Sequence, residues 1–576
     1  MEFSLAVMAK ESFTLTTLGA QVKKWADTDP DTPAFIFVDP TWQRRVLSKG
    51  AVFSLAARFA AILKRLGVRR GDVVSNTLAN SPERVLTHVG VILAGAVSMS
   101  GQVFLKDGDD FVGSLRDASC VAVILDPRQP KGAADLLRVR ERVVAADGKV
   151  VYPELPALRH VLEVCLTPEH GDKSLMETLE EEEETYFSDS RPDDIVVVWI
   201  TSGSTGFSKL VPLSHRNVLL FGEAFTSSLG LAPGDLFYSN GPLGWACSSL
   251  TTYLTCGMTS VLPDFSRHEV EDQFAFIWEL ICREKCTGAF LVPFYIEKLV
   301  KNFARKRKAV DGDQSADSDV QPGTSPTEDW KLRVMASGGQ PLKRPHLAAL
   351  GTITRSIHVA YGSTETGLMA WRPVDDAASY ESCNNGRPYE GVELKVVNES
   401  GDEVGVGQMG EIMCRSQQAF LGYLNNDAST QKTRSPDGWI NTGDIGSLNE
   451  KGEVFVYCRK AFSIIRGAYV LYPGWLETRL LKHPGIVNVM IVPVPDPLLH
   501  QELCACVVTQ PGAKVTAEGV KVFCEDLFLR DQSDHMTAVP RYVLFFDTLP
   551  TTPTGKTCRR TTAALAAQRL GLEPTD

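Results

Sequence analysis

Apolar and polar positions alternate along the chain with two different periods. In residues 53–66 and again in residues 81–94 the apolar residues recur every three or four positions, which predicts amphipathic helices. Between them, residues 72–77 form a short apolar run typical of a buried strand. Helices that alternate with strands predict parallel sheets covered by helices, so we expect an α/β fold for the larger part of the chain.

The pattern changes after Arg459. Three strand-like runs and one helical segment follow, at residues 487–494, 504–509, 542–546 and 520–529. Because a chain of 576 residues exceeds one ordinary core, we predict a large domain and a smaller α+β domain, divided near residues 459–463. The expected domains are residues 1–459 and 460–576.

Two polar segments interrupt the pattern. Residues 180–184 are an acidic run, which predicts a solvated helix end or a linker. Residues 305–329 are charged and rich in Pro, Gly and Ser, so we expect a disordered surface insertion. Its basic residues 305–308 indicate either a solvated surface patch or a localisation signal.

Bulk properties exclude some classes of protein. The net charge of −11 argues against a nucleic-acid binder, which needs a basic surface. No apolar run approaches the ~20 residues of a transmembrane helix. The 13 cysteines form no CxxC pair and no secretory, mitochondrial or peroxisomal signal is recognisable, so we expect reduced thiols in a cytoplasmic protein.

One segment combines hydroxyls, glycines and a lysine: Thr201-Ser202-Gly203-Ser204-Thr205-Gly206-Phe207-Ser208-Lys209. It follows the apolar run of residues 195–200. Glycines let a backbone approach an anion closely, and hydroxyls, amides and the lysine bind phosphate oxygens. Its spacing is not that of a Walker loop, because the fifth residue after Gly203 is Ser208. Taken alone, such a segment is more often an ordinary surface loop.

Four further segments favour the phosphate-binding interpretation over the ordinary surface loop. They are Tyr361-Gly362-Ser363-Thr364-Glu365-Thr366-Gly367, Gly438-Trp439-Ile440-Asn441-Thr442-Gly443-Asp444, the stretch around Arg459, and Leu549-Pro550-Thr551-Thr552-Pro553-Thr554-Gly555-Lys556. With the loop after residue 200, they resemble in order the motifs of the adenylate-forming (AMP-binding) superfamily, and most of all an acyl-CoA synthetase. Residues 66–74 and 93–97 extend the resemblance upstream. It implies a large N-terminal AMP-binding domain and a small, mobile C-terminal lid domain.

The resemblance also implies a reaction. ATP and Mg²⁺ would activate a small-molecule carboxylic acid, fatty or other, as an acyl-adenylate, and coenzyme A would then accept the acyl group. Lys556 is implied as the main catalytic residue, bridging the carboxylate and the α-phosphate, with Glu365 and Thr201 as catalytic residues and Mg²⁺ ligands. The implied nucleotide-binding residues are Thr201, Ser202, Gly203, Ser204, Thr205, Gly206, Lys209, Gly338, Gly339, Tyr361, Gly362, Thr364, Asp444 and Arg459.

Individual roles follow from the same resemblance. Asp444 would accept hydrogen bonds from the ribose hydroxyls, and Arg459 would reinforce that end. Tyr361 offers a flat face to adenine, although a lone tyrosine is usually core packing. Thr364 would touch the α-phosphate. Gly338 and Gly339 would let the backbone pass close to the adenine and acyl groups.

The lid departs from the family pattern. Phe462 stands where the hinge aspartate is common, Ala468 where a second glycine is usual, and Trp475 where a glutamate is usual. These departures leave the acceptor of the acyl group open: coenzyme A, or a carrier-protein thiol, an amine or, as in luciferases, oxygen. A weakened relative that only binds nucleotide or acyl ligand is the third hypothesis.

The sequence indicates the acyl pocket less clearly than the nucleotide-binding motifs. Trp245 follows a Gly-Pro-Leu-Gly segment, and Trp245, Cys247 and Phe294 are candidate pocket residues. No aspartate is present there to pair with a substrate ammonium, which favours a fatty or other non-amino acid. Pocket depth depends on which way side chains face, so neither the length of the acyl chain nor an oligomeric state is predicted.

Overall fold

The computed structural model describes residues 16–101, 108–129, 143–144, 150–166, 173–184, 186, 189–201, 208–239, 241–245, 247–266, 270, 272–310, 330–467, 469–530, 538–551 and 557–572. Four larger sheets organise them.

A six-stranded sheet forms from the segment in which helices and strands alternate. Its order is β10-β9-β4-β3-β5-β8, and all neighbours are parallel except β10 and β9. The bounds are β3 (Val73–Asn76), β4 (Val97–Ser100), β5 (Ala122–Leu125), β8 (His160–Glu163), β9 (Ile195–Thr201) and β10 (Lys209–Ser214).

The helices around this sheet begin at ordinary capping residues. Ser48 caps α3 (Lys49–Arg65), and Ser81, followed by a proline at the first helical position, caps α4 (Pro82–Leu93). The predicted helices at residues 53–66 and 81–94 and the strand at residues 72–77 are therefore confirmed.

A nine-stranded sheet runs in the order β17-β16-β15-β14-β13-β11-β12-β1-β2. Its central strands are parallel, and only the edge pairs are antiparallel. The bounds are β1 (Pro33–Val38), β2 (Arg44–Ser48), β11 (Leu236–Ser239), β12 (Thr259–Pro263), β13 (Gly288–Phe290), β14 (Val334–Gly338), β15 (Ile357–Ser363), β16 (Gly367–Val374) and β17 (Arg387–Pro388).

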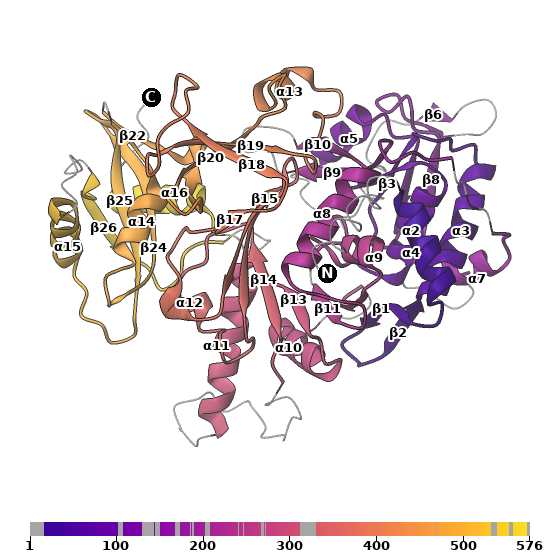
Figure 1. Ribbon diagram of the computed structural model, residues 1–576, viewed down its shortest axis with the longest axis horizontal. Helices are drawn as coiled ribbons and strands as arrows, with labels where there is room; N and C mark the ends of the chain where they lie inside the picture. The colour runs from indigo at the N-terminus through magenta and orange to yellow at the C-terminus, as the bar shows by residue number, and fades with distance from the viewer. Residues whose placement is uncertain are drawn as a thin grey trace.

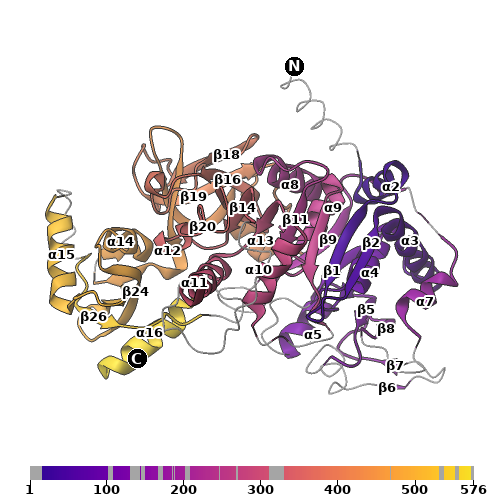
Figure 2. The same ribbon diagram turned by 90° about the horizontal axis from the view of Figure 1, so that it is seen from below.

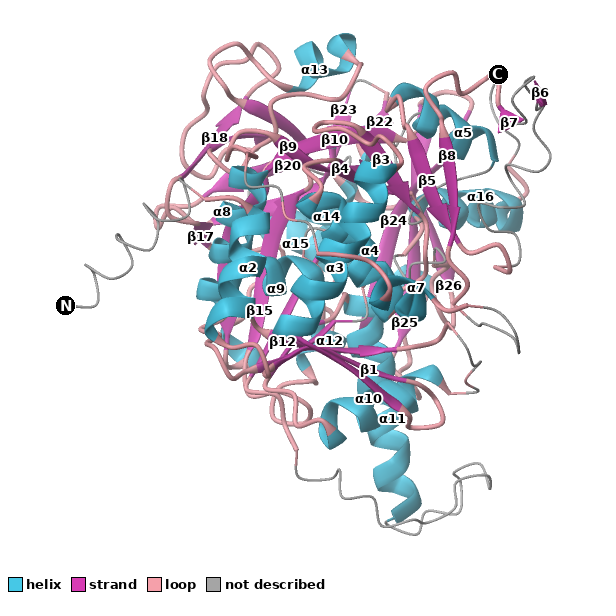
Figure 3. Cartoon of the chain, turned by 90° about the vertical axis from the view of Figure 1, so that its right-hand side faces the viewer, coloured by secondary structure: helices cyan, strands magenta, loops and turns pink. Residues whose placement is uncertain are grey.

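Helices fill the space between these two sheets and cover their outer faces (Figure 1). The middle layer holds α2 (Leu18–Thr28), α3, α4, α8 (His215–Ser228) and α9 (Ser249–Cys256), which share one apolar cluster with strands of both sheets. Figure 3 shows α2, α3 and α4 grouped together. The outer layers are α5 (Gly108–Asp117) on the six-stranded sheet and α10 (Gln273–Arg283), α11 (Pro293–Val310) and α12 (Arg344–Leu347) on the nine-stranded sheet.

Two antiparallel sheets follow along the chain. The first contains β18 (Val392–Val397), β19 (Gly410–Ser416), β20 (Ile440–Leu448) and β21 (Val454–Arg459), with α13 (Asp427–Thr433) between β19 and β20. The second contains β22 (Ile464–Arg466), β23 (Tyr469–Leu471), β24 (Ile486–Asp496), β25 (His500–Thr509) and β26 (Tyr542–Phe545). Only β26 pairs in parallel, with β25.

The second of these sheets and its helices form the smaller C-terminal unit. Its helices are α14 (Pro473–Leu480), α15 (Ala517–Arg530) and α16 (Arg559–Leu570). This unit lies at the end of the molecule opposite α2 and α3 (Figure 2). The predicted strands and helix after residue 459 are confirmed as β24, β25, β26 and α15, and so is the α/β class with a smaller α+β unit. The chain passes from one sheet to the next between Arg459 and Ile464, across a short 3₁₀ turn (Lys460–Phe462).

One expectation is wrong in part. Helix α11 continues to Val310, so residues 305–310 are helical and not disordered. Their alanine, lysines and arginines are good helix formers and extend a helix already established on the sheet. Residues 311–329 lie outside the described residues.

The remaining elements are short. They are α7 (Leu175–Glu180), β6 (Val143–Val144), β7 (Val150–Val151) and a 3₁₀ turn (Ala377–Ser379). Helix α7 ends at Glu180, so the acidic run is a helix end as predicted, and it is largely exposed. Within the described residues, no helix is both long and apolar enough to cross a bilayer.

Candidate functional site

The predicted phosphate loop leaves from a tight pair of strands. Thr201 is the last residue of β9, Lys209 is the first of β10, and the two residues are directly paired. The Thr201 hydroxyl donates to the Lys209 carbonyl at 3.5 Å. Both ends of the loop are therefore held by one antiparallel hairpin. The predicted loop residues Ser202, Gly203, Ser204, Thr205 and Gly206 lie outside the described residues.

A buried carboxylate holds the far end of this loop. Asp110, on α5 and 2% exposed, accepts hydrogen bonds from the Ser208 backbone N–H at 2.9 Å and from its hydroxyl at 2.8 Å. Sequence reasoning missed Asp110, because the two residues are 98 positions apart. The only sequence signal is its place in the first turn of a helix.

The predicted metal ligand Glu365 lies in the turn between β15 and β16. Ser363 and Thr366 close this turn through hydroxyl and backbone hydrogen bonds, and Thr364 is half-buried within it. The Tyr423 hydroxyl donates to Glu365 Oε1 at 2.9 Å, and Lys209 Nζ lies 4.6 Å from the centre of the Tyr423 ring. Tyr423 thus links two predicted site residues, and sequence reasoning missed it.

Tyr423 is a protonated donor. Burial and the neighbouring Glu365 carboxylate raise the pKa of Tyr423 well above its ordinary value. Its hydroxyl is therefore neutral and donates to the carboxylate.

A second cluster joins three predicted residues. Asp444 is 6% exposed on β20; its Oδ2 accepts from the Tyr361 hydroxyl at 2.8 Å, and its Oδ1 lies 3.0 Å from Arg459 Nε. Burial raises the pKa of Asp444, and Arg459 and Tyr361 oppose that effect. Each carboxylate oxygen accepts about two hydrogen bonds, so both retain capacity for a ribose hydroxyl. Arg459 also donates to the Thr442 carbonyl at 2.8 Å.

The predicted glycines occupy positions where a side chain would collide. A Cβ on Gly338 would lie 2.6 Å from the Ala360 carbonyl oxygen, and one on Gly362 would lie 2.4 Å from the Gly367 carbonyl oxygen. Gly339 turns the chain with φ of 77°. These close approaches keep β14 and the β15–β16 turn side by side at the carboxyl end of the sheet.

The segment around Lys556 returns to this glycine turn. Lys556 lies outside the described residues, but Thr551 and Thr557, on either side of residues 552–556, form a β-bridge. Gln340 Nε2 donates to the Thr557 hydroxyl at 3.3 Å. The base of the lysine loop therefore lies against the turn that follows β14.

The predicted acyl-pocket residues separate into two groups. Trp245 and Cys247 pack against an aromatic cluster that includes Phe225 and Phe290. Phe294 instead packs between α10 and α11, against Phe274 and Tyr295, with ring centres 5.9 and 5.7 Å apart. The aromatic cluster therefore brings Trp245 and Cys247 together, and Phe294 is not part of it.

The residues that depart from the family pattern also differ in position. Phe462 is 43% exposed in the 3₁₀ turn between the two antiparallel sheets. Trp475 is 9% exposed on α14, where the Arg479 guanidinium lies 3.6 Å from its ring centre. Trp475 is thus a core residue of the C-terminal unit. Ala468 lies outside the described residues.

Lys343 links the C-terminal unit to the larger part of the chain. It follows the Gly338–Gln340 turn, and its Nζ donates to Asn488 Oδ1 at 2.6 Å and to the Val489 carbonyl at 3.0 Å on β24. Burial lowers the pKa of Lys343, and nearby Glu477 opposes that effect. These contacts fix the orientation in which the base of the lysine loop meets the glycine turn.

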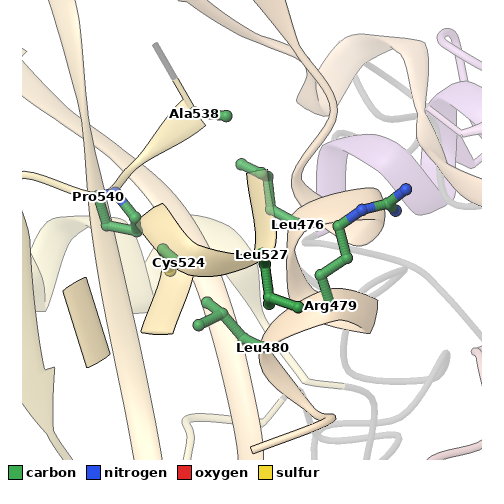
Figure 4. Close-up of a pocket in the computed structure, with 7 residues that line it drawn as sticks. All are labelled: Leu476, Arg479, Leu480, Cys524, Leu527, Ala538 and Pro540. Atoms are coloured by element: carbon green, nitrogen blue, oxygen red, sulfur yellow. The ribbon is translucent and has the colours of Figure 1, made fainter. Parts of the chain in front are cut away.

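The C-terminal unit also contains a mostly apolar pocket, separate from the predicted site residues (Figure 4). It lies between α14 and α15, and its lining residues are Leu476, Arg479, Leu480, Cys524, Leu527, Ala538 and Pro540. None of them is a predicted site residue. Its mostly apolar lining does not suit a phosphate.

The described residues contain no cluster of three or more His, Cys, Asp or Glu side chains that suits a metal ion. Mg²⁺ does not require one, because it commonly binds one or two carboxylates together with substrate phosphates. The single carboxylate of Glu365, which Tyr423 connects to Lys209, is consistent with that mode.

Comparisons with known proteins match two family models to this chain. The model of the AMP-binding enzyme family matches residues 22–424, and that of the AMP-binding enzyme C-terminal domain matches residues 476–556. 4-Coumarate-CoA ligase 1 of Narcissus pseudonarcissus is 28% identical over 537 residues, which cover 91% of this chain and 90% of the relative.

Solved structures share the fold. The amide bond synthetase McbA from Marinactinospora thermotolerans has a TM-score of 0.73 at 23% identity, covering 95% of this chain and 99% of that chain. A Mycobacterium tuberculosis fatty acyl CoA synthetase has a TM-score of 0.68 at 20% identity, covering 96% and 99%.

Proposed function

Because the chain belongs to the family of AMP-binding enzymes, we propose that it activates a fatty or other non-amino carboxylic acid as an acyl-adenylate and then transfers the acyl group to coenzyme A. In this reading it is an AMP-forming acid–thiol ligase of the acyl-CoA synthetase type. ATP, Mg²⁺, the acid and coenzyme A are its small-molecule partners. We also propose that it works in the cytoplasm, where its 13 cysteines would stay reduced.

One observation carries the proposal: side chains from separate motifs, on strands and turns of three different sheets, form two connected groups. The Lys209 ammonium lies over Tyr423, and the Tyr423 hydroxyl bonds Glu365. Beside them, Asp444 bonds both Tyr361 and Arg459. Positive groups for phosphates, a carboxylate for a divalent cation and a carboxylate for a ribose are the parts that phosphate-activating chemistry requires.

Each part then has a role in the first step. Thr201, Lys209 and the loop between them would hold the β- and γ-phosphates and then the leaving pyrophosphate. Glu365 and Thr201 would bind Mg²⁺, which neutralises phosphate charge when bound. Lys556 would bridge the attacking carboxylate and the α-phosphate, in the orientation that the Gln340–Thr557 contact favours.

Nucleotide and acyl groups would meet at the carboxyl end of β14. Asp444 and Arg459 would hold the ribose, with Tyr361 and Gly362 beside the adenine. Gly338 and Gly339 would leave room for the backbone to approach both groups. Thr364 would contact the α-phosphate, and Trp245 and Cys247 would line the acyl pocket.

Coenzyme A is the preferred acceptor because the relative that aligns over 91% of this chain is a CoA ligase. The exposed Phe462 favours a second candidate, an adenylating enzyme with another acceptor. A hinge aspartate can bond to the backbone as the lid turns, whereas phenylalanine cannot. We propose that residues 460–576 move as the lid in either case.

The test is pyrophosphate exchange into ATP across short, medium, long-chain and aromatic acids, followed by product analysis with coenzyme A. Exchange together with an acyl-CoA product is the expected result and identifies the acid. Exchange without acyl-CoA would move the assignment to another acceptor. A chain that binds ATP but exchanges with no acid would contradict the ligase and favour a binding protein.

A further inference from the structure

Tyr423 lies between β19 and α13, outside every motif that predicted the site. Its hydroxyl is 2.9 Å from Glu365 Oε1, and its ring centre is 4.6 Å from Lys209 Nζ. Lys209 belongs to the six-stranded sheet, whereas Glu365 belongs to a turn of the nine-stranded sheet. One side chain therefore joins the phosphate-binding and metal-binding sides of the site.

The backbone around Tyr423 is fixed to both sheets. The Phe420 N–H donates to the Glu365 carbonyl at 2.9 Å, and the Leu424 N–H donates to the Leu210 carbonyl on β10 at 3.0 Å. Tyr423 itself is 7% exposed, and its ring meets the Phe420 ring edge-on at 4.8 Å. A side chain held this firmly can hold its partners firmly as well.

Each contact leaves its partner able to bind ligand. The hydrogen bond occupies Glu365 Oε1 and fixes the carboxylate rotamer, while Oε2 keeps its lone pairs for a cation. The ring attracts the Lys209 ammonium through a cation–π contact, and that ammonium keeps N–H donors for phosphate oxygens.

We propose that Tyr423 is a positioning residue that sets Glu365 for Mg²⁺ and Lys209 for the phosphates of ATP. The inference deepens the proposed function and rests on it for the identity of the ligand. It predicts that the two contacts are separable, because the hydroxyl serves the metal side and the ring serves the phosphate side.

Two substitutions separate them. Tyr423→Phe keeps the ring and removes the hydroxyl, whereas Tyr423→Leu removes both. Titration calorimetry would measure the binding of ATP with Mg²⁺ and, separately, with the metal chelated. We expect Tyr423→Phe to weaken Mg²⁺–ATP binding about tenfold, the usual effect of losing a hydrogen bond to a charged group, and to leave metal-free ATP binding unchanged. Tyr423→Leu should also weaken metal-free ATP binding, about threefold.

Tyr389→Phe is the matched control. The Tyr389 hydroxyl also bonds a carboxylate, Glu223 on α8 at 3.2 Å, outside the predicted nucleotide residues. We expect it to leave both ATP affinities unchanged. Thermal melting of all variants would detect a general loss of folding.

Several outcomes would overturn the inference. Tyr423→Phe could leave Mg²⁺–ATP binding intact, or weaken binding equally with and without metal, which would indicate a merely structural hydroxyl. Tighter metal-free binding by Tyr423→Leu would show that the ring competes with phosphate for Lys209. A wild-type chain that binds Mg²⁺–ATP but activates no acid contradicts the proposed ligase alone, and the variants still decide the role of Tyr423. A wild-type chain that binds no ATP overturns both.

Discussion

The contact between Lys343 and β24 leads to a specific prediction about the two half-reactions. Lys343 Nζ donates to Asn488 Oδ1 at 2.6 Å and to the Val489 carbonyl at 3.0 Å, across the junction between the C-terminal unit and the nine-stranded sheet. In this structure both contacts accompany the orientation in which the base of the lysine loop faces the glycine turn after β14. If the C-terminal unit moves between half-reactions, these contacts stabilise the orientation for adenylation.

The size of the effect follows from the two hydrogen bonds. Each hydrogen bond from a charged donor contributes about 1.5–3 kcal/mol, and desolvation of the ammonium offsets much of that gain. A net contribution of about 2 kcal/mol corresponds to a factor of about 30 in the orientation equilibrium. Lys343→Met keeps a similar volume and removes both donors.

Single-turnover kinetics would test this prediction. We expect Lys343→Met to slow acyl-adenylate formation by up to about thirtyfold, and not to slow thioester formation from preformed acyl-adenylate and coenzyme A. Lys331→Met is the control, because Lys331 is an exposed lysine whose Nζ bonds the Gly351 carbonyl. Equal slowing of both half-reactions, or of neither, would refute the reasoning.

Three other predictions concern single residues. Lys556→Ala should abolish acyl-adenylate formation in a pyrophosphate-exchange assay, slowing it about 10² or more, while ATP binding stays nearly intact; exchange at the wild-type rate would refute the assignment. Asp110→Ala should raise the KM for ATP about tenfold, since it removes the acceptor of both hydrogen bonds from Ser208, and an unchanged KM would contradict its role in holding the loop. Burial lowers the pKa of His215 to about 4, and its Nδ1 accepts from the Leu18 N–H at 3.0 Å. The pKa of His215 is lower in the folded protein than in the unfolded chain, so its contribution to stability is present above the unfolded pKa and is lost as pH falls toward 4. In urea unfolding, this histidine should lower the free energy of unfolding by about 2 kcal/mol between pH 7 and pH 5. His215→Gln should remove that part of the decline.

The family and several elements around the candidate site followed from the sequence. The resemblance to AMP-binding enzymes depended on short motifs, and the family models confirm it across residues 22–424 and 476–556. Helices α3 and α4 and strand β3 were predicted because the spacing of apolar residues reflects structure within a few positions of the chain. The end of α11 was not predicted, because the polar composition of residues 305–329 indicated disorder, whereas the helix continues to Val310.

The partners of the site residues are decided by the tertiary structure. Tyr423 meets Glu365 across 58 positions, Asp110 meets Ser208 across 98, and Lys343 meets Asn488 across 145. Each pair joins segments whose distance depends on the order of strands in a sheet or on the packing of one sheet against another. Backbone propensity and hydrophobic period act locally and can be read along the chain, whereas the contacts of Lys209, Glu365 and Thr557 exist only once distant segments have packed together.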